Sequence, residues 1–172
     1  MKKKIILSLL LIGIIISKSS SFKDSVKLIK ENKFEQAQII LEELYKKSPE
    51  DVYILNNLGV VFLEKNQYNK AERFFNKALD IKKDFKSAFM NLGILYYYRE
   101  DWYTLIKHSF SGIDLFPEER NIIDLIISYS YYRVREFKKA KDVFNKVESE
   151  KLKNNQIELY KHLKNKLRLI TE

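Results

Sequence analysis

The sequence predicts an all-α protein built from repeated helix–turn–helix units, and three observations support this. The stretch "NLGVVFLEKNQYNKAERFFNKAL" starts at Asn57, and a similar stretch, "NLGILYYYREDWYTLIKHSFSGI", starts at Asn91, thirty-four positions further along the chain. Apolar residues in each stretch recur three or four positions apart, which is the spacing of one helix face. The whole chain of 172 residues contains only four Gly and two Pro, as expected for helices joined by short turns.

The unit at residues 52–85 shows how the two helices of a repeat can pack. Each helix carries an apolar face, and each face has a small residue, Gly59 in the first helix and Ala71 in the second. Small residues let two helix backbones approach closely, so we expect the two faces to meet. They consist of Leu55, Leu58, Gly59 and Phe62, and then of Ala71, Phe75 and Ala78.

The same pattern extends in both directions along the chain. An aromatic residue opens every expected second helix, namely Phe34, Tyr68, Trp102 and Phe137. Ala140 follows Leu105 by 35 residues, so one residue is inserted between the third and fourth units. We therefore predict a repeat domain over residues 22–154, with units near 22–51, 52–85, 86–119 and 121–154.

This pattern resembles the tetratricopeptide repeat family, whose repeat unit has about 34 residues. The unit at 52–85 matches best. The third unit departs from the family, because Leu105 stands where a small Ala is usual and Ser109 where a large residue is usual. In the fourth unit, Ser128 takes the place of the Gly. The resemblance implies a right-handed α-solenoid whose first helices line a concave face.

The family's concave positions carry over onto the first helices of units two to four. We expect an aromatic groove there that binds an extended peptide or an amphipathic helix, because tyrosine offers apolar area with a hydrogen-bonding tip. The alternative is that individual tyrosines only pack between repeats. The expected groove residues are Tyr53, Asn56, Asn57, Val60, Met90, Asn91, Ile94, Tyr97, Tyr98, Leu125, Tyr129, Tyr132 and Arg133.

The C-terminal residues 155–172 predict a basic amphipathic helix. Ile157, Tyr160, Leu163, Leu167 and Ile170 form an apolar stripe at helical spacing. A repeat array needs a cover for its last apolar face, so we expect a capping helix here. The alternative is peripheral contact with an anionic membrane, through this helix or through the N-terminus.

The N-terminal segment 1–21, "MKKKIILSLLLIGIIISKSSS", has the composition of a signal peptide. Three lysines precede an apolar run from Ile5 to Ile16, which is shorter than the roughly 20 residues of a membrane-spanning helix. We expect an exported protein of the periplasm or cell envelope. An uncleaved N-terminal helix anchored in the inner membrane is the alternative.

Charge and composition argue against several classes of function. The formal net charge is +9, but four lysines lie within segment 1–21, and residues 151–172 hold six basic residues against two acidic ones. The body of the domain is therefore nearly neutral, unlike the broad basic face of a nucleic-acid binder. The chain has no Cys, and His108 and His162 are part of no metal-ligand spacing.

We therefore expect no enzymatic activity, no metal and no cofactor, and we predict a scaffold or adaptor for protein–protein interaction in the cell envelope. Two alternatives stay open. One is a membrane-tethered structural subunit, and the other is a module that associates with further copies of itself as a homo-oligomer.

Overall fold

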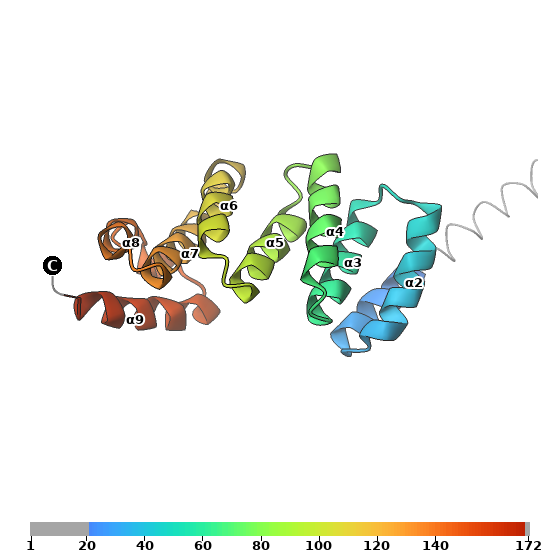
Figure 1. Cartoon of the computed structure of the whole chain (residues 1–172), viewed down its shortest axis with the longest axis horizontal. Coiled ribbons are helices and arrows are strands. Elements are labelled where there is room, and N and C mark those ends of the chain that lie inside the picture. Colours follow the sequence, from blue (N-terminus) through green and yellow to red (C-terminus); the bar gives the residue numbers. More distant parts are fainter. Residues whose placement is uncertain (1–20, 171–172) are drawn as a thin grey trace, which may run out of the picture. The chain divides into compact units, whose positions relative to one another are not determined.

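A computed structural model describes residues 21–170 of the chain, and these residues form helices and short turns without a strand (Figure 1). The expected signal peptide or anchor lies outside the described residues except for Ser21. The chain divides into two compact units with a boundary between Asn91 and Leu92, which falls inside α5 (Lys86–Tyr98). No helix within residues 21–170 combines the length and the apolar character needed to cross a bilayer.

The first compact unit contains a helix over residues 21–30, followed by α2 (Phe34–Lys47), α3 (Val52–Glu64), α4 (Tyr68–Ile81) and the start of α5. Asp51 caps α3, because its carboxylate accepts hydrogen bonds from the backbone N–H groups of Tyr53 and Ile54 at 3.1 and 3.3 Å. The helices α3 and α4 pack together, and Phe75 is completely buried between them and their neighbours.

The second compact unit contains the rest of α5, then α6 (Trp102–Leu115), the short 3₁₀ turn η1 (Pro117–Glu119), α7 (Arg120–Arg133) and α8 (Phe137–Phe144). A second 3₁₀ turn, η2 (Ser149–Lys151), leads into α9 (Asn154–Arg168). Asp101 caps α6 by accepting a hydrogen bond from the backbone N–H of Thr104 at 3.2 Å. The helix α7 is one residue longer than α5, with 14 residues against 13, in agreement with the predicted insertion.

The backbone of the turns repeats as regularly as the sequence does. The four residues with positive φ among the described non-glycine residues are Asn32, Asn66, Glu100 and Arg135, with φ between 55° and 63°. Successive members of this set lie one repeat period apart, with the inserted residue before the last, and each lies in the turn between the two helices of a unit. The left-handed conformation reverses the chain direction, so the second helix can return along the first. The predicted helix–turn–helix repeat is thus confirmed.

The two helices of a repeat pack closely in a different way in each of the second, third and fourth repeats. A Cβ atom at Gly59 would lie only 2.6 Å from Cδ1 of Phe75, so this ring requires a glycine opposite it. At Gly93 a Cβ atom would meet His108 Cδ2 at 3.6 Å, an ordinary contact, because Ser109 stands where Phe75 stands in the preceding unit. In the fourth unit the Ser128 hydroxyl donates a 2.7 Å hydrogen bond to the carbonyl of Ala140 on α8.

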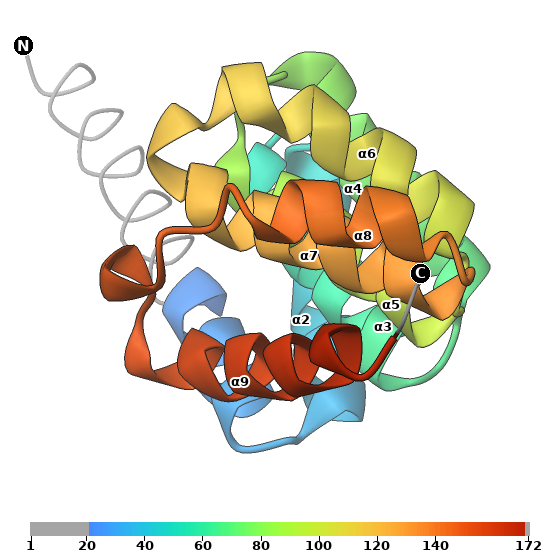
Figure 2. The same ribbon diagram turned by 90° about the vertical axis from the view of Figure 1, so that its left-hand side faces the viewer.

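The last helix, α9, covers the apolar end of the fourth unit. Figure 2 shows α9 running alongside α7 and α8, and both helices contact it. Its inward side chains Leu163 and Leu167 are buried against Leu125 and Ala140. The ring of Tyr160 stacks on Phe144 with ring centroids 4.9 Å apart. The predicted capping helix is confirmed.

Substituting the two glycines should separate the two modes of packing. Gly59→Ala should destabilise the protein by about 1–3 kcal/mol, because the methyl group overlaps a buried ring that has no room to move. Gly93→Ala should be neutral or stabilising by up to about 1 kcal/mol, because alanine favours the helix and its methyl group fits. Urea unfolding of the two variants measures both effects, and equal destabilisation by both would contradict the proposed packing.

The left-handed turn residues predict a stabilising substitution. Arg135→Asn should raise the free energy of unfolding by up to about 1 kcal/mol, because asparagine adopts positive φ at lower cost than arginine. The reverse change at the matching position of the first unit, Asn32→Arg, should destabilise by a similar amount. Thermal unfolding followed by circular dichroism compares the pair. A lower melting temperature for Arg135→Asn would show that the arginine side chain serves another purpose.

Candidate partner-binding surfaces

Three aromatic rings meet at the turn between α5 and α6, in the second compact unit. The Tyr97 ring lies edge-on to the Trp102 ring, with centroids 5.5 Å apart. The Tyr129 ring, on α7, also lies edge-on to Trp102, with centroids 5.8 Å apart. Tyr97 and Tyr129 are themselves 6.1 Å apart. Aromatic pairs at these distances attract one another beyond their buried area, so the rings hold each other in place.

Arg133 completes this cluster from the last turn of α7. Its guanidinium carbon lies 4.2 Å from the Trp102 ring centroid, close enough for a cation–π interaction. Nη1 donates a 3.1 Å hydrogen bond to the Tyr129 hydroxyl, and Nη2 lies 3.3 Å from a carboxylate oxygen of Glu100. The Glu100 side chain is 67% exposed, so water weakens this ion pair and leaves the rings as the main support of the guanidinium.

The ionisation of the cluster follows from these contacts. The hydrogen bond to Tyr129 raises the pKa of the Arg133 guanidinium above its usual value. Burial raises the pKa of the Tyr97 hydroxyl, and the neighbouring Tyr129 adds to this shift. At neutral pH the cluster therefore holds the positive charge of Arg133 beside the neutral hydroxyl of Tyr97.

The exposed part of the cluster lies on α5. Ile94, Tyr97 and Tyr98 are 44%, 45% and 55% exposed, whereas Trp102 beneath them is only 9% exposed. We define the α5 aromatic surface as Ile94, Tyr97, Tyr98, Trp102, Tyr129 and Arg133. Trp102 is not among the predicted groove residues, because the sequence pattern marks it only as the aromatic residue that opens a second helix. The signal was its closeness to Tyr97 in the sequence, since only a short turn joins the two helices.

One predicted groove residue of α7 is not available to a partner, and this prediction is wrong. Leu125 is completely buried in the apolar cluster beneath α9, because the capping helix needs an apolar face to pack on. Tyr129 and Tyr132 are partly buried against the same cluster. Tyr132 also packs on Phe137, with ring centroids 5.8 Å apart.

The predicted groove residues of the first compact unit form a separate set. Tyr53 is 58% exposed and lies edge-on to Phe85, with centroids 5.2 Å apart. Asn91 donates a 2.9 Å hydrogen bond to the side-chain oxygen of Asn56, which is only 8% exposed, so Asn56 is a second predicted groove residue that is not available to a partner. Half-buried positions are occupied by Asn57, Val60 and Met90.

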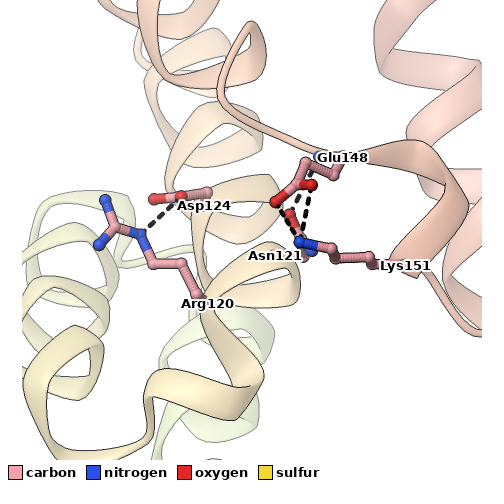
Figure 3. A network of polar contacts seen from close by, with 5 residues as sticks. All are labelled: Arg120, Asn121, Asp124, Glu148 and Lys151. Carbon is pink, nitrogen blue, oxygen red and sulfur yellow. Dashed lines mark hydrogen bonds and ion pairs between the residues drawn. The ribbon is translucent and has the colours of Figure 1, made fainter.

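A polar pocket of about 560 Å³ lies elsewhere in the second unit, where η1 and the start of α7 face the segment after α8. In Figure 3, Arg120 Nε forms an ion pair with the Asp124 carboxylate at 2.8 Å. The Asn121 side-chain oxygen accepts a 3.0 Å hydrogen bond from the backbone N–H of Glu148. Lys151 in turn pairs with Glu148 at 2.7 Å. The pocket is lined by Pro117, Glu118, Arg120, Asn121, Asp124, Lys146, Glu148 and Lys151.

Asp124 is the unusual member of this pocket, and sequence analysis missed it. It is 3% exposed at the position that Leu55 and Phe89 occupy in the preceding units. Its ion pair with Arg120 supplies the partner that a buried carboxylate requires. Basic and acidic side chains around the pocket are equal in number, and the network ties α7 to the segment after α8. Within residues 21–170, no group of three or more His, Asp or Glu side chains is placed to hold a metal ion.

Comparison with known proteins agrees with this fold. Residues 31–84 match the family model of the tetratricopeptide repeat. Residues 31–84 thus belong to the tetratricopeptide repeat family, and the described residues have the stacked helix pairs of that fold.

Two curated relatives are much longer proteins. The chain is 22% identical over 124 residues to the RNA polymerase-associated protein CTR9 of Caenorhabditis elegans, covering 72% of this chain and 11% of that protein. It is 30% identical over 132 residues to the anaphase-promoting complex subunit CDC16 of Saccharomyces cerevisiae, covering 73% and 15%. The chain thus spans less than a sixth of either relative.

Solved structures share the fold at low sequence identity. A structure of MamA is 15% identical with a TM-score of 0.64, covering 89% of this chain and 91% of that one. A tetratricopeptide repeat protein of Thermus thermophilus is 15% identical with a TM-score of 0.61, covering 74% and 71%. YrrB, described as a tetratricopeptide repeat protein with an unusual peptide-binding site, is 16% identical with a TM-score of 0.61, covering 73% and 64%.

The corrected role of Leu125 gives a direct test. Leu125→Ala should cost about 2–5 kcal/mol of stability, because it opens a cavity beneath α9. Tyr98→Ala should change stability by less than about 1 kcal/mol, since the ring is mostly exposed. Denaturant unfolding of both variants measures the difference. A nearly neutral Leu125→Ala would return this residue to the partner surface.

Proposed function

We propose that the protein is a non-enzymatic scaffold of the cell envelope that binds a segment of another protein on the α5 aromatic surface. One observation carries the proposal, namely that Tyr97 and Tyr98 are exposed above a buried Trp102 while Arg133 is fixed beside them. Tyrosine, tryptophan and arginine are the residues most enriched at the energetic centres of protein interfaces.

The geometry favours a peptide or a helix as the bound segment. The rings are held by mutual contacts before a partner arrives, so binding costs less side-chain entropy. Apolar side chains of the partner would pack on the tyrosine rings, and a carboxylate could pair with the Arg133 guanidinium in place of Glu100. The peptide-binding site for which YrrB is described gives a precedent on the same fold.

The proposed location rests on the N-terminal sequence. Lysines followed by an apolar run of twelve residues and by small serines are typical of an export signal. The alternative is a membrane-tethered structural subunit that keeps this segment as an anchor. The mass of the native protein distinguishes the two, because cleavage near Ser20 or Phe22 removes the anchor.

Self-association is the second candidate function, favoured by the exposed apolar side chains of the second unit. Tyr103, Phe110 and Leu115 on α6 are 64%, 45% and 42% exposed. A homo-oligomer would cover such residues. Light scattering over a range of concentrations measures the mass, and a strict monomer would exclude this candidate.

The scaffold proposal predicts that Tyr97→Ala combined with Tyr98→Ala abolishes partner capture, with at least a tenfold loss of crosslinked product, because interface aromatics each contribute about 2 kcal/mol or more. The measurement is in-cell crosslinking in the source organism, followed by purification of the full chain and identification of the crosslinked protein. Helicity should stay close to that of the wild type, and the melting temperature should fall only slightly, because Tyr97 loses its contacts with Trp102 and Tyr129.

The matched control is Tyr103→Ala combined with Phe110→Ala, which removes two exposed rings of α6 outside the α5 aromatic surface. This variant should keep its crosslinks. If the control loses the partner while the α5 variant keeps it, the proposed surface is on the wrong helix.

A further inference from the structure

Positive charge is concentrated at one end of the described chain. Residues 135–170 contain eleven Lys or Arg against five Asp or Glu, a net charge of +6. Residues 21–91 contain thirteen against eleven, and residues 92–134 contain four against six. The basic excess therefore belongs to α8, α9 and the segment between them, and not to the α5 aromatic surface.

The helix α9 turns an edge of basic side chains outward. Lys161, Lys164 and Arg168 follow one another at helical spacing, and all three are exposed, whereas Leu163 and Leu167 on the opposite side are buried. Lys138 and Lys139 on α8 also lie outside the buried core. We define the C-terminal basic surface as Lys138, Lys139, Lys161, Lys164 and Arg168.

The contacts of these residues leave most of their charges accessible. Lys139 pairs with Glu136 and lies over the Tyr131 ring, but its side chain is 59% exposed. Lys161 pairs with Glu158 at 3.3 Å, but both side chains are more than 60% exposed, so the pair is weak. The ammonium of Lys164 lies 5.7 Å from the Tyr160 ring centroid, so its aliphatic stem lies across the protein surface. Leu169, 74% exposed, follows Arg168 directly.

We infer that the C-terminal basic surface docks on an anionic phospholipid membrane. The apolar face of α9 is already occupied by α7 and α8, so the contact is electrostatic and does not require the helix to insert. Nine of the eleven basic residues in 135–170 are lysines, which act as hydrated point charges and suit headgroups without fixed geometry.

Other polyanions fit this surface less well. Single-stranded nucleic acid is usually held by aromatic rings that stack on bases, and the ring of α9, Tyr160, already stacks on Phe144. An acidic protein would favour bidentate arginine contacts, and this surface carries one arginine. The inference is independent of the proposed partner site, because the two surfaces share no residue.

The test measures partition of the purified protein, with its native N-terminus, into phosphatidylcholine vesicles with and without phosphatidylglycerol. The triple variant Lys161→Glu, Lys164→Glu and Arg168→Glu should lower the ratio of the two partition coefficients at least about tenfold, since each basic residue near an anionic surface contributes roughly fivefold. Added salt should lower the wild-type ratio and leave that of the variant nearly unchanged.

The control combines Lys30→Glu, Lys82→Glu and Lys83→Glu, which together reverse three exposed charges of the first compact unit. Its net charge equals that of the triple variant, so it should keep most of the preference for anionic vesicles. The N-terminal segment is common to all the proteins and does not affect their comparison. Circular dichroism shows whether each variant is folded.

Three results would overturn the inference. The α9 variant could partition like the wild type, or the control could lose as much as the α9 variant, which would mean that net charge alone acts. A third result is that wild-type protein ignores anionic vesicles but shifts a single-stranded oligonucleotide at physiological salt, which would assign the surface to nucleic acid.

Discussion

The close approach of two helices within each repeat is the constraint on which the rest of the structure depends. In the second repeat it requires Gly59 opposite the buried ring of Phe75, and in the fourth it uses a hydrogen bond from Ser128 to the carbonyl of Ala140. The two helices of each repeat are joined by a very short turn, in which the chain must reverse its direction. The left-handed residue at the same place in every unit provides that reversal, although the last two units use Glu100 and Arg135 in place of asparagine.

The short turn also creates the α5 aromatic surface. Tyr97 lies in the last turn of α5 and Trp102 begins α6, so a turn of this length brings their rings together. Tyr129 and Arg133 then reach the same rings from α7. The packing of the third unit tolerates this, because Ser109 and Leu105 have exchanged bulk relative to the preceding unit and Gly93 is no longer tightly enclosed. A repeat that departs from the family pattern in its core thus carries the exposed aromatic side chains of its first helix.

The helix α9 uses its two sides for different physical purposes. Its apolar side buries Leu163 and Leu167 against α7 and α8 and removes the exposed end that a repeat array would otherwise leave. Its other side keeps lysines and arginine in water and concentrates the charge of the chain. Because the apolar side is already satisfied, the basic side can contact an anionic surface without disturbing the fold.

The repeat period, the positions of the helices and the capping role of α9 could all be predicted from sequence, because each follows from spacing along a single helix or turn. The accessibility of the partner residues could not, since it depends on which helices come together. Leu125 and Asn56 occupy the same position in their first helices as the half-buried Met90, yet α9 covers the first and the side chain of Asn91 binds the second. The stacking of Arg133 on Trp102 and the burial of Asp124 beside Arg120 likewise join side chains whose meeting only tertiary packing decides.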